Sequence, residues 1–221
     1  MTATKTGYHH GDLGAALIDA GLQLTRLGGP EALTVREATR RVGVSPNAAY
    51  RHFADREALL KAVAIAIGDR MAARMLPPVS RRGSPQNRAR NQLRAVGLGY
   101  IGFALDEPGW FTVAFFGGSA SLDGGEAKLG PPHKPSGSGV TSVDDAGVPP
   151  PFRALVDALD AMADAGVLQA NRRAGAEWPC WSAVHGFAEL ALRGPLRGAP
   201  RPDLDALAGR TVDDIIAGLV G

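Results

Sequence analysis

The residues best suited to chemistry lie in one short segment, Ser45 to Phe53, where hydroxyl, amide, guanidinium and imidazole groups follow one another. Ser45, Asn47 and Ala48 stand at its start, and small or polar side chains in that place fit the base edges of the DNA major groove. Longer side chains that could reach phosphates beside the groove follow: Tyr50, Arg51, His52 and Arg56. The segment therefore predicts a DNA-recognition helix, in which Phe53 packs inward.

Two short helices must position these side chains. Thr34 and Glu37 have capping-box spacing, with a hydroxyl and a carboxylate that can each accept from the other's backbone N–H. Gly43 ends the helix that they begin, because a left-handed turn costs glycine least. Ser45 and Pro46 then start the next helix in the preferred order of N-cap residue and N1 proline. Two helices joined by a glycine turn form a helix-turn-helix.

Longer helices are expected on both sides of this pair. A helix capped near Asp12 runs to Leu27, where a Gly-Gly-Pro sequence stops it. Its apolar residues recur at helical spacing on one face that we expect to be buried: Leu13, Leu17, Ala20, Leu24 and Leu27. Asp55 caps a fourth helix that runs to about Met75. Its apolar stripe consists of Leu59, Leu60, Val63, Ile67 and Met71.

A break after the fourth helix divides the chain. Pro77 and Pro78 begin a basic stretch containing Gly, Ser and Pro that ends near Pro85. We expect an all-α protein with a DNA-binding domain over 8–56, a connecting helix over 57–76 and a ligand-binding and dimerisation domain over 85–221. The last domain is predicted to hold helices near 86–105, 110–116, 152–165, 177–193 and 203–219, with a long loop over 117–151.

Composition and charge agree with a globular DNA-binding protein. Of the 221 residues, 45% are hydrophobic and 6% aromatic. The single cysteine, Cys180, excludes an internal disulfide, which fits a reducing cytoplasm, and no apolar run is long enough to cross a membrane. Residues 1–76 carry 10 basic and 7 acidic groups, residues 77–105 carry 5 and 0, and residues 106–221 carry 9 and 15. The basic first half is expected of a region that approaches a polyanion.

An aromatic cluster in the second domain offers a place for a small molecule. We expect a mostly apolar pocket built from Tyr100, Phe103, Trp110, Phe111, Phe115, Trp181 and His185. The Tyr100 hydroxyl and His185 are its candidate polar anchors. The alternative is that the rings only pack the core or a subunit interface. His185 and Glu189 stand one helical turn apart, but two ligands are too few for a structural zinc site, so no metal is expected.

The last two helices carry apolar stripes that are wider than one packing partner needs. We therefore expect them to pack against the same helices of a second subunit, as a four-helix interface. The residues predicted to lie there are Val184, Phe187, Leu190, Ala191, Leu207, Ile215 and Leu219.

The segment from Tyr8 to about Met75 resembles the tetracycline-repressor (TetR) family. The resemblance rests on the Tyr-x-His-Phe ending of the recognition helix at 50–53, on the basic Arg56 after it, and on Thr34 and Arg36 at the start of the preceding helix. The family pattern usually has a bulkier residue at Ala49 and a lysine at Arg56. The resemblance implies an obligate homodimer, an all-α ligand-binding domain and release of DNA when a ligand binds.

A second resemblance concerns the C-terminal half. Residues 181–186, which read Trp-Ser-Ala-Val-His-Gly, and the segment from Tyr100 to Pro108 are similar to the Trp-His-Gly subclass of TetR C-terminal domains. This similarity implies relatives in fold and does not identify a ligand.

The sequence thus predicts a cytoplasmic, ligand-responsive DNA-binding regulator without enzymatic activity, metal or cofactor. As a homodimer it would repress transcription from a palindromic operator and be released by a small hydrophobic or aromatic effector. The alternative is a small-molecule-binding or enzymatic helical domain without DNA binding. That alternative requires the helix-turn-helix spacing, the helix caps and the basic flank to coincide by chance.

Overall fold

The computed structural model describes residues 13–78, 82–117 and 148–221. Within these ranges the regular structure is entirely helical, so the predicted all-α class is confirmed. The cap expected at Asp12 lies outside the described residues, as does most of the loop expected over 117–151. The last two residues of this predicted loop, Pro150 and Pro151, belong instead to a helix that begins at Pro150.

The N-terminal part consists of one longer helix and three short elements, and its buried residues are continuous with the core of the rest of the chain. These elements are α1 (Leu13–Gly28), a 3₁₀ turn η1 (Pro30–Ala32), α2 (Val35–Val42) and α3 (Pro46–Ala49). Leu17 and Ala20 on α1 are buried as predicted, and Leu13 and Leu24 are half-buried. Leu27 departs from the prediction, because its side chain is 91% exposed. The apolar stripe of α1 therefore stops one turn before the helix does.

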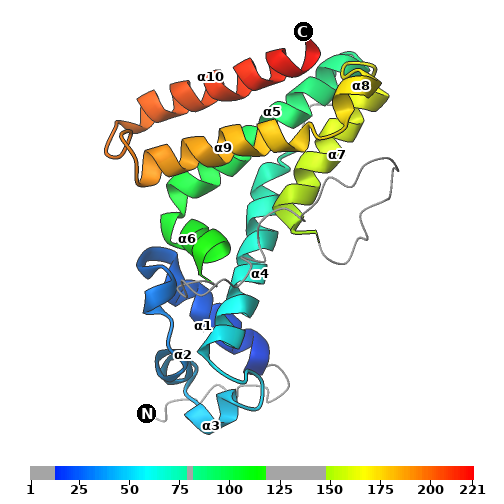
Figure 1. Ribbon diagram of the computed structural model, residues 1–221. Helices are drawn as coiled ribbons and strands as arrows, with labels where there is room; N and C mark the ends of the chain where they lie inside the picture. Colours follow the sequence, from blue (N-terminus) through cyan, green and yellow to red (C-terminus); the bar gives the residue numbers. More distant parts are fainter. Residues whose placement is uncertain (1–12, 79–81, 118–147) are drawn as a thin grey trace, which may run out of the picture.

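Helix α4 (Arg56–Met75) links the two parts of the molecule (Figure 1). The Asp55 carboxylate accepts from the backbone N–H of Ala58 at 2.8 Å, which is the predicted cap. The predicted apolar stripe is buried throughout: Leu59, Leu60, Val63, Ile67 and Met71. Gly21 on α1 faces Val63 so closely that a Cβ there would lie 2.5 Å from its methyl carbon, so α1 and α4 pack tightly.

The C-terminal part is built around α5 (Pro85–Asp106), which packs against α4, α7, α9 and α10 (Figure 1). The other helices are α6 (Pro108–Phe116), α7 (Pro150–Asp164), α8 (Ala170–Arg173), α9 (Glu177–Leu192) and α10 (Arg201–Val220). The short α8 was not expected from the sequence. The last two helices, α9 and α10, lie side by side at the end of the molecule opposite α3 (Figure 1).

Candidate DNA-binding surface and effector cavity

The helix-turn-helix is held from inside by apolar contacts. Gly43 adopts a left-handed conformation with φ 78°, as predicted for the residue that ends α2. Ala49 on α3 is buried, and Phe53 is half-buried against the core. This fixed inner side determines which side chains of α3 and the following turn remain on the surface.

The outer side of the motif gathers the side chains predicted to contact DNA. Most of them are exposed: Thr34, Arg36, Ser45, Pro46, Asn47, Tyr50, Arg51 and His52. Ala48 is half-buried, and Tyr50 is 53% exposed although it is a large aromatic residue. The regular helix covers only Pro46–Ala49, and the chain continues to Phe53 in tighter turns. The recognition element is therefore shorter than the sequence indicated.

Arg56 has a different environment from the one predicted. Its Nε donates to the carbonyl oxygen of Leu33 at 2.7 Å, and its Nη2 donates to that of Pro30 at 2.6 Å. Both carbonyls belong to the connection between α1 and α2, and the arginine itself is half-buried. We therefore infer that Arg56 holds this connection against the start of α4, in place of the phosphate contact predicted from the sequence.

The two N-caps of the motif also differ from prediction in detail. Thr34 Oγ1 accepts from the backbone N–H of Glu37 at 3.1 Å, as expected. The Glu37 carboxylate instead pairs with Arg40 at 2.7 Å and with Arg41 at 3.4 Å, so the reciprocal half of the capping box is replaced by ion pairs. The hydrogen bond from Arg40 is the main reason that the pKa of Glu37 falls to about 2. Ser45 occupies the N-cap position of α3 without a capping side-chain hydrogen bond.

The basic stretch after α4 does not lie beside the helix-turn-helix. Three of the five arginines counted over 77–105 are on α5, which begins at the end of the molecule opposite α3 (Figure 1): Arg88, Arg90 and Arg94. Arg88 donates to the carbonyl of Gly83 at 2.6 Å, and Arg94 pairs with Asp213 on α10 at 2.6 Å. These arginines are therefore remote from the proposed DNA-binding surface.

A small cavity lies in the C-terminal part, where α4, α5, α7, α9 and α10 meet. Its volume is about 20 Å³, which is space for about one water molecule. Of the residues that the structure describes, no charged one lines it. The lining residues are Met75, Leu93, Val96, Gly97, Tyr100, Leu155, Cys180, Trp181, Val184, Val212, Ile215 and Ile216.

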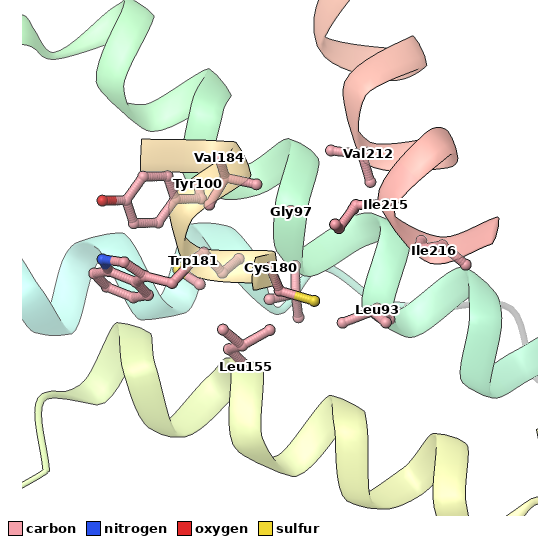
Figure 2. A pocket seen from close by; sticks show the side chains of 12 residues that line it. Leu93, Gly97, Tyr100, Leu155, Cys180, Trp181, Val184, Val212, Ile215 and Ile216 are labelled. Carbon is pink, nitrogen blue, oxygen red and sulfur yellow. The ribbon is translucent and has the colours of Figure 1, made fainter. Parts of the chain in front are cut away.

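The polar ends of the aromatic lining residues point out of the cavity. In Figure 2 the Tyr100 hydroxyl and the Trp181 N–H lie on the side of their rings away from Ile215 and Ile216. The Tyr100 hydroxyl is 2.8 Å from His185 Nδ1. Burial raises the pKa of Tyr100 and lowers that of His185, so both groups favour their neutral forms. The predicted polar anchors thus bind each other rather than facing the cavity.

The cavity includes only part of the predicted pocket. Tyr100 and Trp181 line it, whereas five predicted members do not: Phe103, Trp110, Phe111, Phe115 and His185. Phe111 and Phe115 pack behind Tyr100, with ring centroids 5.9 and 6.0 Å from its own. Trp110 lies further away and donates to the Leu22 carbonyl of α1 at 2.8 Å. Aromatic side chains mark the neighbourhood, but aliphatic ones form most of the wall.

Several residues predicted for the dimer interface belong to the core of the chain instead. Four of them are at most 8% exposed: Val184, Phe187, Ala191 and Leu219. Val184 and Ile215 line the cavity. Leu190 and Leu207 do lie on the surface, 46% and 42% exposed. The wide apolar stripes are explained largely by contacts of α9 and α10 with α5 and with each other.

Several lining residues were not identified from the sequence as functional. Met75 was expected only as the end of the fourth helix, and no functional role was predicted for Leu93, Val96 or Cys180. Gly97 is the lining residue that the sequence could have indicated. In the structure, a Cβ at Gly97 would lie 3.0 Å from a Val212 methyl. A glycine on the buried stripe of a long helix marks a place where another element comes close.

Cys180 is chemically inert in this setting. Burial raises the pKa of its thiol to about 11, so it stays protonated near neutral pH. Among the described residues, no group of three or more His, Cys, Asp or Glu side chains could hold a metal ion. None of the helices described is both long enough and apolar enough to span a bilayer.

Comparison with known families covers both parts of the chain. Residues 17–63 match the family described as bacterial regulatory proteins, tetR family. Residues 93–215, more than half of the chain, match the family described as tetracyclin repressor-like, C-terminal domain. The finer resemblance to the Trp-His-Gly subclass stays a prediction. No curated protein sequence gives a match.

Solved structures show the same fold at low sequence identity. A protein of unknown function from Rhodococcus sp. RHA1 is 23% identical, with 98% of this chain and 100% of that chain covered and a TM-score of 0.67. FadR from Bacillus subtilis in complex with stearoyl-CoA is 13% identical, with 92% and 98% covered and a TM-score of 0.61. A TetR variant from Acinetobacter baumannii AYE in complex with minocycline is 20% identical, with 92% and 94% covered and a TM-score of 0.58.

These matches agree with the geometry. The N-terminal match contains the helix-turn-helix, and the C-terminal match contains most of the cavity lining. The members of this family are transcription regulators with a DNA-binding and a ligand-binding domain, so the expectation that the chain is not an enzyme is also confirmed by its family. The chain belongs to the TetR family of transcriptional regulators.

Proposed function

We propose that this regulator is a repressor that binds a palindromic operator as a homodimer in the cytoplasm and leaves it when an apolar small molecule binds. The observation that carries the proposal is the outer face of the helix-turn-helix. Its polar side chains are exposed, while Ala49 and Phe53 hold the same segment from inside. Such an arrangement offers hydrogen-bonding groups to DNA without losing the packing that orients them.

Roles can be proposed for the individual residues of this face. Asn47 is placed to read a base, because its amide can pair bidentately with adenine in the major groove. Ser45, Pro46 and Ala48 lie beside it and would contact base edges or methyl groups. The remaining exposed residues would position the protein on the phosphates: Thr34, Arg36, Tyr50, Arg51 and His52.

A second copy of the chain would pack on the outer faces of α9 and α10. Leu190 and Leu207 are exposed there. Gly186 and Gly218 have nothing within 4 Å of the place where a Cβ would stand, so their helix faces are open. Glycines on open helix faces allow close approach of partner helices. In the proposed dimer the recognition helices must lie about 34–36 Å apart, one turn of duplex.

The effector is proposed to enter the cavity at the end of α4. The wall is apolar, and the polar ends of Tyr100 and Trp181 are turned away from it. The cavity must therefore expand around a hydrophobic or aromatic molecule rather than offer it hydrogen bonds. The structural neighbours crystallised with stearoyl-CoA and minocycline support the view that this fold can hold bulky ligands.

Selection of DNA from a random library tests the DNA-binding part of the proposal. Full-length protein should enrich an inverted repeat and bind it with an affinity that falls steeply as salt rises. Asn47→Ala should reduce enrichment of that repeat. Failure to enrich any sequence at low salt would favour the alternative without DNA binding.

The effector part is tested by thermal shift with a panel of fatty acids and aromatic hydrocarbons. A hit should raise the melting temperature of the wild-type protein and release the selected DNA. Leu155→Phe, which fills the cavity from α7, should lose the thermal shift. A hit that stabilises both proteins equally would bind elsewhere and contradict the assignment of the cavity.

A further inference from the structure

One carboxylate oxygen on α9 is buried without a hydrogen-bond donor. The two oxygens of Glu189 differ in this respect. Its Oε2 accepts from Arg193 at 3.2 Å, whereas its Oε1 is shielded from solvent and has no partner among the described residues. Buried acceptors without a donor are rare in native proteins, because the lost hydration is not replaced. The described part of the chain therefore supplies no donor for an oxygen that needs one.

Glu189 belongs to a row of polar side chains on the side of α9 that faces α6. His185, Glu189 and Arg193 follow one another at intervals of four residues, so they share one face of the helix. The Phe116 ring of α6 meets both ends of the row, 6.4 Å from the His185 ring centroid and 4.4 Å from the Arg193 guanidinium. Arg193 also donates to Thr112 on α6 at 3.0 Å. Glu189 is thus held between two residues that both contact α6.

The same row leads back to the cavity. Trp181 lines the cavity and stands one turn before His185, with the two rings stacked at a centroid distance of 6.4 Å. His185 binds the hydroxyl end of Tyr100, which points out of the cavity (Figure 2). Burial raises the pKa of Tyr100 and lowers that of His185, and the charge of Glu189 raises both, so the carboxylate lies near these groups. Trp181 and Glu189 are separated by about 12 Å along α9.

The surroundings of Glu189 Oε1 favour a neutral donor over a charged one. Arg193 already pairs with the carboxylate through Oε2, so a second cation would lie beside the guanidinium. An anionic group would be repelled by the carboxylate itself. The rings of Phe115 and Phe116, with centroids 5.1 and 6.4 Å from that of His185, make the neighbourhood otherwise apolar. A hydroxyl group on an elongated apolar molecule supplies the one hydrogen that Oε1 lacks.

We propose that Glu189 Oε1 is the specificity-determining acceptor for the effector, which is an elongated, neutral alcohol or phenol. The hydroxyl donates to Oε1, and the apolar body extends past His185 into the cavity beside Trp181. The proposal rests on the proposed function, in which the cavity expands around an apolar body. It adds the chemical class of the polar head and the residue that recognises it.

A matched pair of compounds separates the hydroxyl from the apolar body. 4-Pentylphenol and 4-pentylanisole share the ring and the alkyl chain, but only the phenol has an O–H to donate. A hydrogen bond to a charged acceptor is strong enough for a tenfold difference in affinity. Titration calorimetry with the wild-type protein should therefore give at least tenfold tighter binding of the phenol. 4-Pentylbenzoate and 4-pentylbenzylamine, which carry charged heads, should both bind more weakly than the phenol, and tighter binding of either would contradict a neutral head.

Substitutions at Glu189 test whether this residue is the acceptor. Glu189→Leu should lower the affinity for the phenol about tenfold, to that of the anisole. Glu189→Gln keeps the shape and adds an N–H that can donate to an ether, so the preference should fall below twofold. Glu177→Gln is the matched control, because Glu177 lies on the first turn of the same helix and accepts from Arg173 at 3.0 Å. It should keep the tenfold preference.

Thermal melting without a ligand gives an independent readout. Glu189→Leu removes the unpartnered oxygen together with a partly exposed ion pair, so it should raise the Tm by about 2–4 °C. A Glu189 that only stabilised the fold through Arg193 would lower the Tm when it is replaced and would leave the preference for the phenol unchanged. That combination would overturn the proposal.

The remaining outcomes distinguish this proposal from the proposed function. Equal binding of phenol and anisole to the wild type, both lost in Leu155→Phe, would leave the cavity as the effector site and refute the role of Glu189. A tenfold preference that survives Glu189→Leu would place the hydroxyl elsewhere and refute it as well. If neither compound binds the folded wild-type protein, the alcohol or phenol class is wrong, while the fatty acids and aromatic hydrocarbons of the thermal-shift panel still test the cavity.

Discussion

Arg56→Ala should destabilise the protein, because the structure gives this side chain two backbone partners in the connection between α1 and α2. Its guanidinium donates to the carbonyls of Leu33 and Pro30 at 2.7 and 2.6 Å. A hydrogen bond from a charged donor contributes about 1.5–3 kcal/mol, and the lower end applies here because the side chain is half-buried. Removing both bonds should therefore cost about 3 kcal/mol.

The expected change is large enough for a melting experiment. For a chain of about this length, 1 kcal/mol corresponds to roughly 2–4 °C, so Arg56→Ala should lower the Tm by about 6–12 °C. Arg56→Lys keeps the charge but not the forked geometry of the guanidinium, so its Tm should lie between those of the wild type and Arg56→Ala. Arg51→Ala is the matched control, because Arg51 is exposed on the same surface and should affect DNA binding rather than stability.

DNA affinity measured well below the Tm decides between the two roles. If Arg56 mainly fastens the connection, Arg56→Ala should keep the salt dependence of the wild type, whereas Arg51→Ala should lower the slope by about one. An Arg56→Ala protein with the same Tm as the wild type, but with a salt slope lower by about one, would refute the structural role. It would restore the phosphate contact expected from the sequence.

Four further outcomes follow from the same geometry. Asn47→Ala should cost about 1–3 kcal/mol on the selected sequence and spare non-specific binding, whereas Tyr50→Phe should weaken all sequences equally; both are read by fluorescence anisotropy. Burial lowers the pKa of His185, so the unfolded chain binds this proton more readily. Stability measured by urea unfolding should therefore fall as the pH drops below about 6.5, and His185→Gln should reduce that loss. Arg90→Gln, on the part of α5 remote from α3, should leave the salt slope unchanged.

Local signals predicted the helices well because their causes are local. The left-handed Gly43, the Asp55 cap and the apolar stripe of α4 depend on residues within a few positions of one another. The same holds for the inner side of the recognition helix, where Phe53 packs against the core as expected. Leu27 is the exception: periodicity extended the stripe to this residue, but its side chain is 91% exposed.

The positions of the cavity and of the candidate dimer interface could not be predicted from local sequence signals. Periodicity shows which face of α9 is apolar, but it does not show how many neighbours cover that face. Val184 and Phe187 were assigned to a second subunit because one partner would not need so wide a stripe. In the structure α9 packs against α5, α7 and α10 of its own chain, and these contacts use the stripe.

The distribution of charge is likewise not predictable from local sequence, and it affects how the protein would bind DNA. Arg94 pairs with an aspartate 119 residues later, and Arg26 pairs with a glutamate 81 residues later. A count along the sequence cannot distinguish such arginines from those that face a phosphate. Arg36 and Arg51 remain exposed beside α3, whereas the arginines of early α5 lie at the other end of the molecule. Among the described residues, the cations placed to contact DNA are therefore the few around the helix-turn-helix. A loss of any one of them should be visible in the salt slope, because the arginines of α5 are too remote to compensate for it.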